Sequence, residues 1–224
     1  MKIINLIGSP HGAKSNTARL LRIVAEGAES LGAITETIFL TGRNVLPCKG
    51  CDACHKTGKC VQKDEFGGIQ QKILGADGLI LGSPNYIFHV SAQMKAFMDR
   101  CCRAIHCLAF ESKYGASVVT SGGGDETPIA AYMNHFLMIT GIRPVGAVWA
   151  TMGAIDAETF PEDIRKPAFE LGKNLVLSWK EKSVSPETEK TISEFKERMR
   201  SLILWRKDEW PYEYNYWKQR RGLE

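Results

Sequence analysis

The chain has 224 residues, of which 44% are hydrophobic and 24% are charged, and its formal net charge is +4. A chain of this length buries one substantial core and has no second block large enough to require another. Because its Lys and Arg residues are interspersed with acids, the composition argues against a nucleic-acid-binding surface and places the charge on solvated faces.

The amino terminus and the distribution of apolar residues predict a cytoplasmic protein. No uncharged run reaches the length needed to cross a bilayer, and Met1-Lys2 leads into strand sequence without a signal-peptide h-region. Four of the seven cysteines lie between positions 48 and 60. In a cytosolic protein, this cysteine count indicates metal or redox chemistry rather than disulfides.

The first predicted unit is a strand, a loop and a helix. A strand is expected at Lys2–Ile7, and apolar residues recur at helical spacing after residue 19. Between them, residues 8–17 (GSPHGAKSNT) form a hydroxyl-rich loop that leads into a helix start, which Ser15 or Asn16 can cap. Unpaired N–H groups and the helix dipole suit a phosphate there, although these residues also populate ordinary turns.

The loop matches neither of two established nucleotide-binding patterns. Both G-x-x-x-x-G-K-[ST] and G-x-G-x-x-G are absent from it. A hydroxyl-rich loop with the single Lys14 suits the terminal phosphate of a mononucleotide better than a pyrophosphate. Flavin mononucleotide (FMN) is therefore the first candidate ligand.

The remaining chain alternates between predicted strands and predicted helices. Further strands are expected at Ile34–Leu40, Gly78–Gly82, Tyr114–Thr120 and Arg143–Ala150. Helices are expected near residues 65–74, 91–107, 129–140, 163–179 and from 186 onward. The segments 83–90 (SPNYIFHV) and 121–126 (SGGGDE) are predicted loops.

Alternating strands and helices imply right-handed crossovers and a parallel sheet covered on both faces. Five such strands fit the doubly wound order 2-1-3-4-5, which places a ligand crevice at the carboxyl ends of strands 1, 3 and 4. The loops at 8–17, 83–90 and 121–126 lie at those three ends. Three separate signals therefore converge on one predicted site.

The domain organisation follows from these elements. The core domain is expected to span residues 1–180, with a Cys-rich loop at 47–61, and a helical, aromatic-rich extension is expected at 181–224. Residues 205–217 include six aromatic residues, too many for a short extension to bury on its own. We expect this tail to pack on a neighbouring subunit, where it would help to fix the oligomer, in preference to another surface of the core; a partly ordered terminus is the alternative.

Several short motifs together resemble the NADPH-dependent FMN reductase branch of the flavodoxin-like proteins. They are G-S-P with S-N-T at the first helix, S-P-N-Y with V-S-A-Q-M-K-A-F-M-D-R after the third strand, and S-G-G-G after the fourth. The run Cys48-x2-Cys51-x2-Cys54-x5-Cys60, with Val61 and Asp64-Glu65 after it, is similar to the iron-sulfur flavoprotein members of that family. The resemblance covers roughly residues 1–150 and implies a flavodoxin-like α/β fold.

The resemblance also implies where FMN binds. The residues matching phosphate contacts are Ser9, His11, Ser15, Asn16 and Thr17, with His11 at a position often occupied by Arg. One side of the isoalloxazine would be lined by Pro84, Asn85, Tyr86 and Phe88, and its other edge by Ser121, Gly122 and Gly123. Tyr86 and Phe88 could instead be surface-loop aromatics that pack on the sheet edge. A homodimer or homotetramer with flavins near subunit boundaries is implied as well.

The four clustered cysteines allow three interpretations. C-x2-C-x2-C is the core of ferredoxin-type ligation, which favours one 4Fe-4S cluster on Cys48, Cys51, Cys54 and Cys60. A zinc site and metal-free thiols are the alternatives. His55, within the run, is expected to face solvent, with a supporting hydrogen bond to the site as the other possibility.

Other cysteines and histidines carry weaker signals. Cys101, Cys102 and Cys107 follow the third strand and are expected to be buried as small apolar side chains. The sequence identifies no partner for the histidines at positions 89, 106 and 135.

The sequence favours an FMN-dependent oxidoreductase. It would take hydride from NAD(P)H, or electrons from a redox partner, and pass them to a flavin, a quinone or a protein. No general base is predicted because the flavin carries the chemistry. The alternatives are a flavodoxin-like electron-transfer protein, a cluster-free NAD(P)H:FMN or quinone reductase, and a non-enzymatic nucleotide-binding module. Neither nucleic acid nor a membrane is an expected partner.

Overall fold

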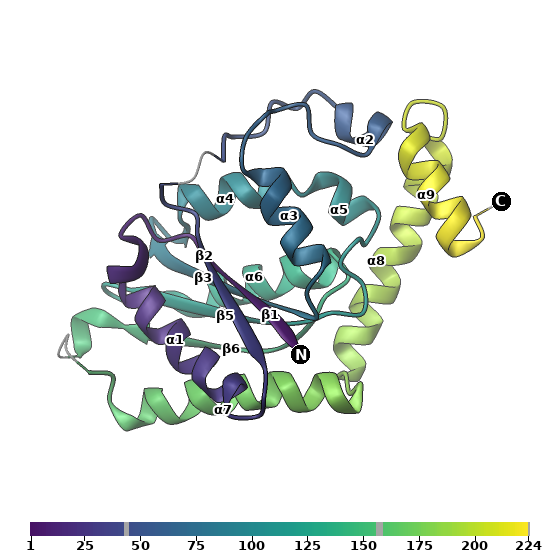
Figure 1. Ribbon diagram of the computed structural model, residues 1–224. Helices are drawn as coiled ribbons and strands as arrows, with labels where there is room; N and C mark the ends of the chain where they lie inside the picture. Colours follow the sequence, from purple (N-terminus) through teal and green to yellow (C-terminus); the bar gives the residue numbers. More distant parts are fainter. Residues whose placement is uncertain (43–44, 156–158, 224) are drawn as a thin grey trace.

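Five parallel strands form the central sheet of the computed structural model, which describes residues 1–42, 45–155 and 159–223 (Figure 1). They are β1 (Lys2–Ile7), β2 (Ile34–Phe39), β3 (Gly78–Tyr86), β5 (Tyr114–Ser121) and β6 (Arg143–Thr151), in the order β2-β1-β3-β5-β6. The short β4 (His89–Val90) pairs antiparallel with the end of β3. The predicted flavodoxin-like order is confirmed, because β4 changes only the numbering of the last two parallel strands.

Helices cover both faces of this sheet (Figure 1). They are α1 (Asn16–Glu29), α2 (Ala53–Thr57), α3 (Phe66–Leu74), α4 (Ala92–Asp99), α5 (Cys102–His106), α6 (Glu126–Ile139), α7 (Glu162–Glu181), α8 (Pro186–Trp205) and α9 (Pro211–Arg221). Two short 3-10 turns, η1 (Gly12–Lys14) and η2 (Met152–Ala154), follow β1 and β6.

The core consists of two apolar layers separated by the sheet. Along β1, Ile3 and Ile7 pack with α1 and α7, whereas Ile4 and Leu6 pack with α3, α4 and α6 on the opposite face. Side chains alternate across a strand, so a strand covered on both faces must be apolar at nearly every position. This explains the continuous apolar runs in the sequence.

Two predicted boundaries were wrong. The expected loop at 83–90 begins as strand, because Ser83 and Pro84 continue the parallel pairing with β5 and the next two residues pair with β4. The expected helix at 91–107 is divided into α4 and α5. Between them the amide of Arg100 donates to the carbonyl of Phe97 at 3.2 Å, which tightens the turn.

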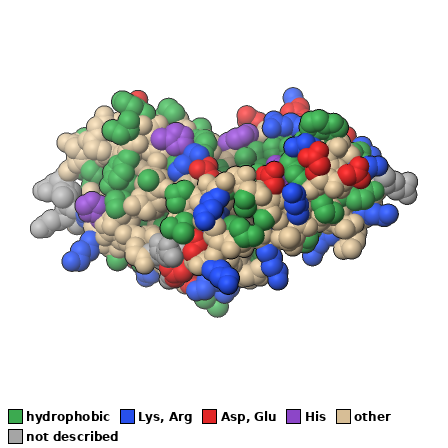
Figure 2. Space-filling view, turned by 90° about the horizontal axis from the view of Figure 1, so that it is seen from above, with side chains coloured by type: hydrophobic (Ala, Val, Ile, Leu, Met, Phe, Trp, Pro, Cys, Tyr) green, Lys and Arg blue, Asp and Glu red, His purple; other side chains and the backbone are tan. Residues whose placement is uncertain are grey.

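Charged side chains of both signs are interspersed over the upper surface of the molecule (Figure 2). This view shows no single-sign stripe of the kind that follows a nucleic-acid backbone. Among the described helices, none has the length and apolar character needed to cross a membrane.

Helices α1 and α7 approach closely through two glycines. A Cβ atom placed on Gly172 would lie 1.9 Å from the carbonyl oxygen of Val24, and one on Gly27 would lie 1.9 Å from that of Phe169. Because both obstacles are backbone atoms, no side-chain rotation could relieve the overlap. The helix pair therefore requires glycine at both positions.

We predict that Gly172→Ala lowers the free energy of unfolding by about 1–3 kcal/mol, because the two helices must separate. The measurement is urea denaturation. Gly68→Ala in α3 is the matched control, since a Cβ there meets no atom within 4 Å. It should leave stability unchanged or raise it by up to about 1 kcal/mol through helix propensity. Equal stability of the two variants would contradict the close packing.

The C-terminal extension folds back onto the core of the same chain. Helix α8 leaves the end of α7 and α9 lies beside α2 (Figure 1). Trp210 and Trp217 are buried with Leu108, Met199 and Ile203 in a third apolar cluster. The indole Nε1 of Trp217 donates to the carbonyl of His106 at 3.0 Å. Of the two locations expected for the tail, the structure thus shows packing on the core.

We predict that Trp217→Ala reduces the free energy of unfolding by about 3–5 kcal/mol, because it opens a cavity and leaves a carbonyl without its donor. Trp205→Ala is the control, since Trp205 is 77% exposed. That change should stay within about 0.5 kcal/mol. A comparable loss in both variants, measured by thermal and urea unfolding, would argue against specific docking of α9.

Candidate functional site

The loops that follow β1, β3 and β5 meet at one edge of the sheet. The first loop approaches α4 so closely that a Cβ on Gly8 would lie 2.7 Å from the Cβ of Met94. The Gly8 amide donates to the carbonyl of Gly82 at 2.8 Å, and the hydroxyl of Ser91 donates to the carbonyl of Gly8. These contacts fix the first loop against the end of β3.

The hydroxyl groups of the first loop hold its backbone in place. Ser15 caps α1 by accepting from the amide of Ala18 at 3.1 Å, and its own hydroxyl donates to the carbonyl of Gly12 at 2.7 Å. The hydroxyls of Thr17 and Thr120 lie 2.6 Å apart and link α1 to β5. Ser15 and Thr17 therefore have structural partners. Because the Ala18 amide already donates to Ser15, the first-turn amides of α1 that are left to a ligand are those of Asn16 and Thr17.

A pocket of about 260 Å³ lies among these loops. Its lining residues are Ser9, His11, Lys14, Ser15, Asn16, Thr17, Pro84, Asn85, Tyr86, Thr120, Ser121, Gly122 and Met152. Ten of the twelve residues predicted to bind the cofactor are among them. Phe88 and Gly123 are not in this lining, whereas Lys14, Thr120 and Met152 are additional to the prediction.

The additional residues follow from the topology. Thr120 is the last residue of the predicted fourth strand, so its position at the carboxyl end could have identified it. Met152 follows β6, the fifth parallel strand, whereas the switch-point rule points only to the loops after the first, third and fourth. The sequence signal for Met152 was therefore weak.

Phe88 lies at the tip of a strained hairpin. It and Ile87 form the two-residue connection between β3 and β4, with φ angles of 60° and 49°. Such a tight turn favours Asn and Gly, because bulky side chains are strained at positive φ. Ile87 is 90% exposed and Phe88 72% exposed. A strained apolar tip beside a pocket is typical of a functional surface.

The glycine-rich loop after β5 is held by one buried carboxylate. Glu126 accepts from the hydroxyls of Ser121 and Thr151, the second at 2.6 Å. Burial opposes ionisation of Glu126, but these hydrogen bonds outweigh it and hold its pKa below the usual value. The side-chain amide of Asn85 donates to the carbonyl of Gly124 at 2.9 Å, while its buried Oδ1 has no partner.

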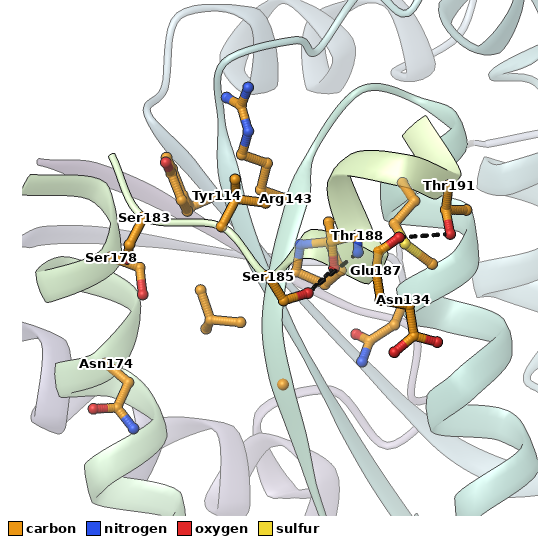
Figure 3. Close-up of a pocket in the computed structure, with 15 residues that line it drawn as sticks. Tyr114, Asn134, Arg143, Asn174, Ser178, Ser183, Ser185, Glu187, Thr188 and Thr191 are labelled. Atoms are coloured by element: carbon orange, nitrogen blue, oxygen red, sulfur yellow. Dashed lines mark hydrogen bonds between the residues drawn. The ribbon is translucent and has the colours of Figure 1, made fainter. Parts of the chain in front are cut away.

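A larger cavity, of about 620 Å³, opens elsewhere between α6, α7, α8 and β6 (Figure 3). It includes Tyr114 and Arg143, the first residues of β5 and β6, so it lies at the amino ends of those strands. In this cavity the Ser185 hydroxyl accepts from the Thr188 amide at 3.2 Å and so caps α8. The cavity is therefore distant from the switch-point edge where doubly wound sheets bind ligands.

The Cys-rich loop, residues 47–61, contains α2 and lies above α3 and α4 (Figure 1). All four of its cysteines are free; Cys48 and Cys51 are exposed, and Cys54 and Cys60 are half-buried. The guanidinium of Arg100 donates to Cys60 Sγ at 3.2 Å. The four thiols are therefore accessible as ligands.

Arg100 anchors the Cys-rich loop to the core. It forms a two-pronged ion pair with Asp64, at 2.5 and 3.0 Å, and donates to the carbonyl of Leu46 at 3.0 Å. Its Nε is buried without a partner. Burial opposes ionisation of Asp64, but hydrogen bonds from Arg100 and nearby amides outweigh it and hold its pKa below the usual value.

The spacing of potential ligands distinguishes the metal interpretations. Among the described residues, one group has three ligand atoms within 4.8 Å of one another, and it is His55, Cys102 and His106. The loop cysteines do not form such a single-ion group in the described chain. In a 4Fe-4S cluster each thiolate binds a different iron, so such a cluster does not require its four sulfurs to meet at one ion.

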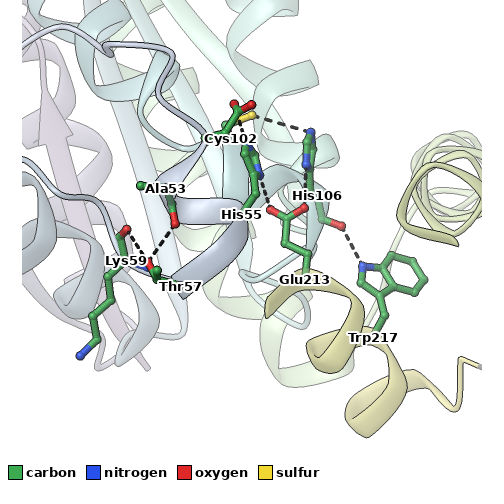
Figure 4. A network of polar contacts seen from close by, with 9 residues as sticks. Ala53, His55, Thr57, Lys59, Cys102, His106, Glu213 and Trp217 are labelled. Carbon is green, nitrogen blue, oxygen red and sulfur yellow. Dashed lines mark hydrogen bonds and ion pairs between the residues drawn. The ribbon is translucent and has the colours of Figure 1, made fainter. Parts of the chain in front are cut away.

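His55 differs from the prediction, because it is buried rather than facing solvent. Its Nδ1 donates to Glu213 Oε1 at 2.6 Å, and Nδ1 of His106 donates to Glu213 Oε2 at 3.0 Å (Figure 4). Glu213 lies 107 residues beyond His106, so local sequence could not reveal this partner.

The three cysteines after β3 have different environments. Cys101 and Cys107 are fully buried as predicted, and burial raises the pKa of the Cys107 thiol to about 12. Cys102 differs, because it is only partly buried and its Sγ lies 3.7 Å from Nε2 of His106. Burial opposes its ionisation, but hydrogen bonds from His106 and His55 outweigh it and lower its pKa to about 6.

Comparison with known proteins places this geometry in a family context. The family model described as NADPH-dependent FMN reductase matches residues 1–156. An iron-sulfur flavoprotein of Archaeoglobus fulgidus is 30% identical over 221 residues, which are 98% of this chain and 99% of the relative.

Solved structures agree on the fold. RosB, crystallised with 8-demethyl-8-formylriboflavin-5'-phosphate, aligns with a TM-score of 0.66 and 14% identity over 81% of this chain and 79% of RosB. An archaeal flavodoxin aligns with a TM-score of 0.53 and 15% identity over 80% of this chain and 99% of the flavodoxin. Because the family model matches residues 1–156 and the Archaeoglobus relative aligns with 98% of the chain, the chain belongs to the NADPH-dependent FMN reductase family, in the group that includes the iron-sulfur flavoproteins.

Proposed function

We propose that the chain is an NAD(P)H-dependent oxidoreductase that binds FMN in the pocket at the ends of β1, β3 and β5. A 4Fe-4S cluster on Cys48, Cys51, Cys54 and Cys60 would exchange electrons with the flavin and with a small-molecule or protein acceptor. The observation that carries the proposal is the convergence of three loops on one pocket at the strand-order switch point.

The first loop supports binding of the FMN phosphate. Its hydroxyls fix the backbone, so the amides at the start of α1 are held toward the pocket with the positive end of the helix dipole behind them. Lys14, Asn16 and His11 line the same part of the pocket and could contact phosphate oxygens. Ser15 and Thr17 would act mainly through the backbone they order.

The other two loops support binding of the flavin ring. The buried Oδ1 of Asn85 is an acceptor without a partner and suits an N–H group of the ligand. Tyr86 and Met152 offer apolar surface, and Gly122 allows the backbone to approach the ring closely. When bound, the isoalloxazine accepts hydride and releases electrons singly or in pairs. These residues would orient the ring, and no side chain is required as a general base.

The Cys-rich loop supports the cluster. Its four thiols are free. The guanidinium of Arg100 already donates hydrogen bonds to Cys60 Sγ and to the backbone carbonyl of Leu46. Hydrogen bonds to ligating sulfurs tune the potential of such clusters. A cluster bound there would pass single electrons between the flavin and an acceptor.

Assembly into a homodimer or homotetramer would cover the exposed hairpin tip beside the pocket. Ile87 and Phe88 are apolar, solvent-exposed and strained, which suits a surface that another subunit contacts. This arrangement would place each flavin near a subunit boundary.

For the phosphate site, we predict that Asn16→Asp weakens FMN binding at least tenfold, a difference of about 1.4 kcal/mol, by repelling the phosphate. Asn16 Oδ1 accepts from Arg19 at 3.0 Å, and the new carboxylate preserves that acceptor. Fluorescence-quenching titration measures both FMN and riboflavin. Riboflavin lacks the phosphate, so its affinity should not change.

The riboflavin titration gives the test its specificity. If both ligands lost affinity equally, the substitution would have distorted the pocket, and if neither did, the phosphate would bind elsewhere. Anaerobic mixing with NADH or NADPH then separates an enzyme from an electron carrier. The proposed enzyme bleaches its FMN absorbance with one of them, whereas a flavodoxin-like carrier does not.

For the cluster, we predict that anaerobically purified protein contains about four iron and four sulfide ions per chain, together with one FMN. Cys48→Ser should lose iron and sulfide while retaining FMN, since Cys48 is exposed on the loop and is not in the pocket lining. Elemental analysis and visible absorbance measure both groups. Wild-type protein with stoichiometric FMN but no iron would refute the cluster and leave the flavin proposal standing.

A further inference from the structure

A second set of potential ligands lies outside the Cys48–Cys60 set and the flavin pocket. We propose that His55, Cys102 and His106 bind a single divalent transition-metal ion of the zinc class, with Glu213 positioning both imidazoles. The ligands come from α2 and α5, and the positioning carboxylate comes from α9 (Figure 4). The site would join the C-terminal helix to the Cys-rich loop.

The distances match those of a tetrahedral ion. Cys102 Sγ lies 3.7 Å from His106 Nε2, and the ligand atoms of all three residues lie within 4.8 Å of one another. Bonds of about 2.3 Å to sulfur and about 2.0 Å to nitrogen at a tetrahedral angle place those two atoms roughly 3.5 Å apart. An ion therefore fits between them with little movement.

Glu213 fixes the direction of both imidazole rings. Its two oxygens accept from Nδ1 of His55 and Nδ1 of His106, so each ring has its Nε2 on the opposite edge, and Cys102 contacts both rings. A histidine that donates its other N–H to a carboxylate is the usual arrangement behind a metal-bound imidazole. Because one carboxylate accepts from Nδ1 of both rings, the lone pairs of the two Nε2 atoms point toward a common position.

A divalent ion can take the place of the protons that balance the charge of the cluster. Without an ion, burial opposes protonation of His106, but its hydrogen bonds to Cys102 and Glu213 outweigh burial and raise its pKa to about 9. Glu213 is completely buried, and a metal-binding Cys102 is a thiolate, so with the neutral imidazoles that ligation requires the group carries a charge of −2. A buried net charge is costly unless it is neutralised, and a bound divalent ion would neutralise it.

The surroundings limit the type of ion and its access to water. Two imidazoles and a thiolate suit zinc and exclude the oxygen-preferring magnesium and calcium. The ring of Trp210, the residue that precedes α9, stacks on His55 with centroids 4.6 Å apart and covers the site. Asp52 Oδ1 lies 3.8 Å from His55 Nε2 and is half-exposed, so this carboxylate or a water would supply the fourth ligand.

The test uses the full chain carrying Cys48→Ala and Cys51→Ala, because that background leaves the Cys-rich loop with two thiols. After removal of metal by a chelator, cobalt is titrated in and absorbance is recorded. We expect one equivalent to bind with tetrahedral ligand-field bands and a thiolate-to-cobalt charge-transfer band. Zinc should displace it.

Three further substitutions in this background assign the ligands. Cys102→Ala should abolish the charge-transfer band and weaken cobalt binding at least about 100-fold, whereas Cys101→Ala, at the fully buried neighbouring thiol, should keep it. Glu213→Gln should keep the band but weaken binding about 10–100-fold, as expected of a positioning residue. Circular dichroism checks folding, and His106→Gln replaces Cys102→Ala if that variant is unfolded.

Two results would overturn the site. A folded background variant that binds no cobalt would leave the cluster as a hydrogen-bonded network that only docks α9. A charge-transfer band that survives Cys102→Ala would assign the ion to the remaining loop thiols. Neither result bears on FMN or the iron-sulfur cluster.

Discussion

The position of β1 between β2 and β3 determines where this protein can bind a ligand. From β1 the chain crosses to β2 on one side and then returns to β3 on the other. Helices that follow neighbouring strands therefore leave toward opposite faces, and the loops after β1 and β3 diverge. The pocket lies among those loops, and the hydrogen bond from the Gly8 amide to the Gly82 carbonyl fixes the start of the first loop beside β3. The side chains and amides of these loops then determine which ligand the pocket accepts.

The fold was predictable because its signals are local. Glycine-bounded apolar runs such as Gly78–Gly82 mark strands buried on both faces, and helical spacing marks the layers between them. Most of the pocket was predictable for the same reason, since loops at strand ends are placed by topology. Phe88 is outside the pocket lining and lies in the exposed connection between β3 and β4, a pairing that SPNYIFHV does not reveal.

The groups that the sequence did not reveal are those paired over long distances. His55 and His106 each look unpartnered until Glu213 is brought to them by α9. Similarly, the turn between α4 and α5 lies at Arg100, whose guanidinium reaches Asp64 on a different segment. A buried Arg with a buried Asp is stable only while both remain, because either alone is an uncompensated charge. The Cys-rich loop is therefore held in place by the folded core.

The tail is best understood as part of the support for that loop. The family model ends at residue 156, yet the Archaeoglobus relative aligns with 98% of this chain, so the similarity extends beyond the parallel sheet. Helix α9 packs on α2, which carries Cys54 and His55, and Trp217 fastens it to the end of α5. A loop with two exposed cysteines and few apolar side chains has little core of its own. Its geometry must come from neighbours, which here are Arg100 on one side and the C-terminal helix on the other.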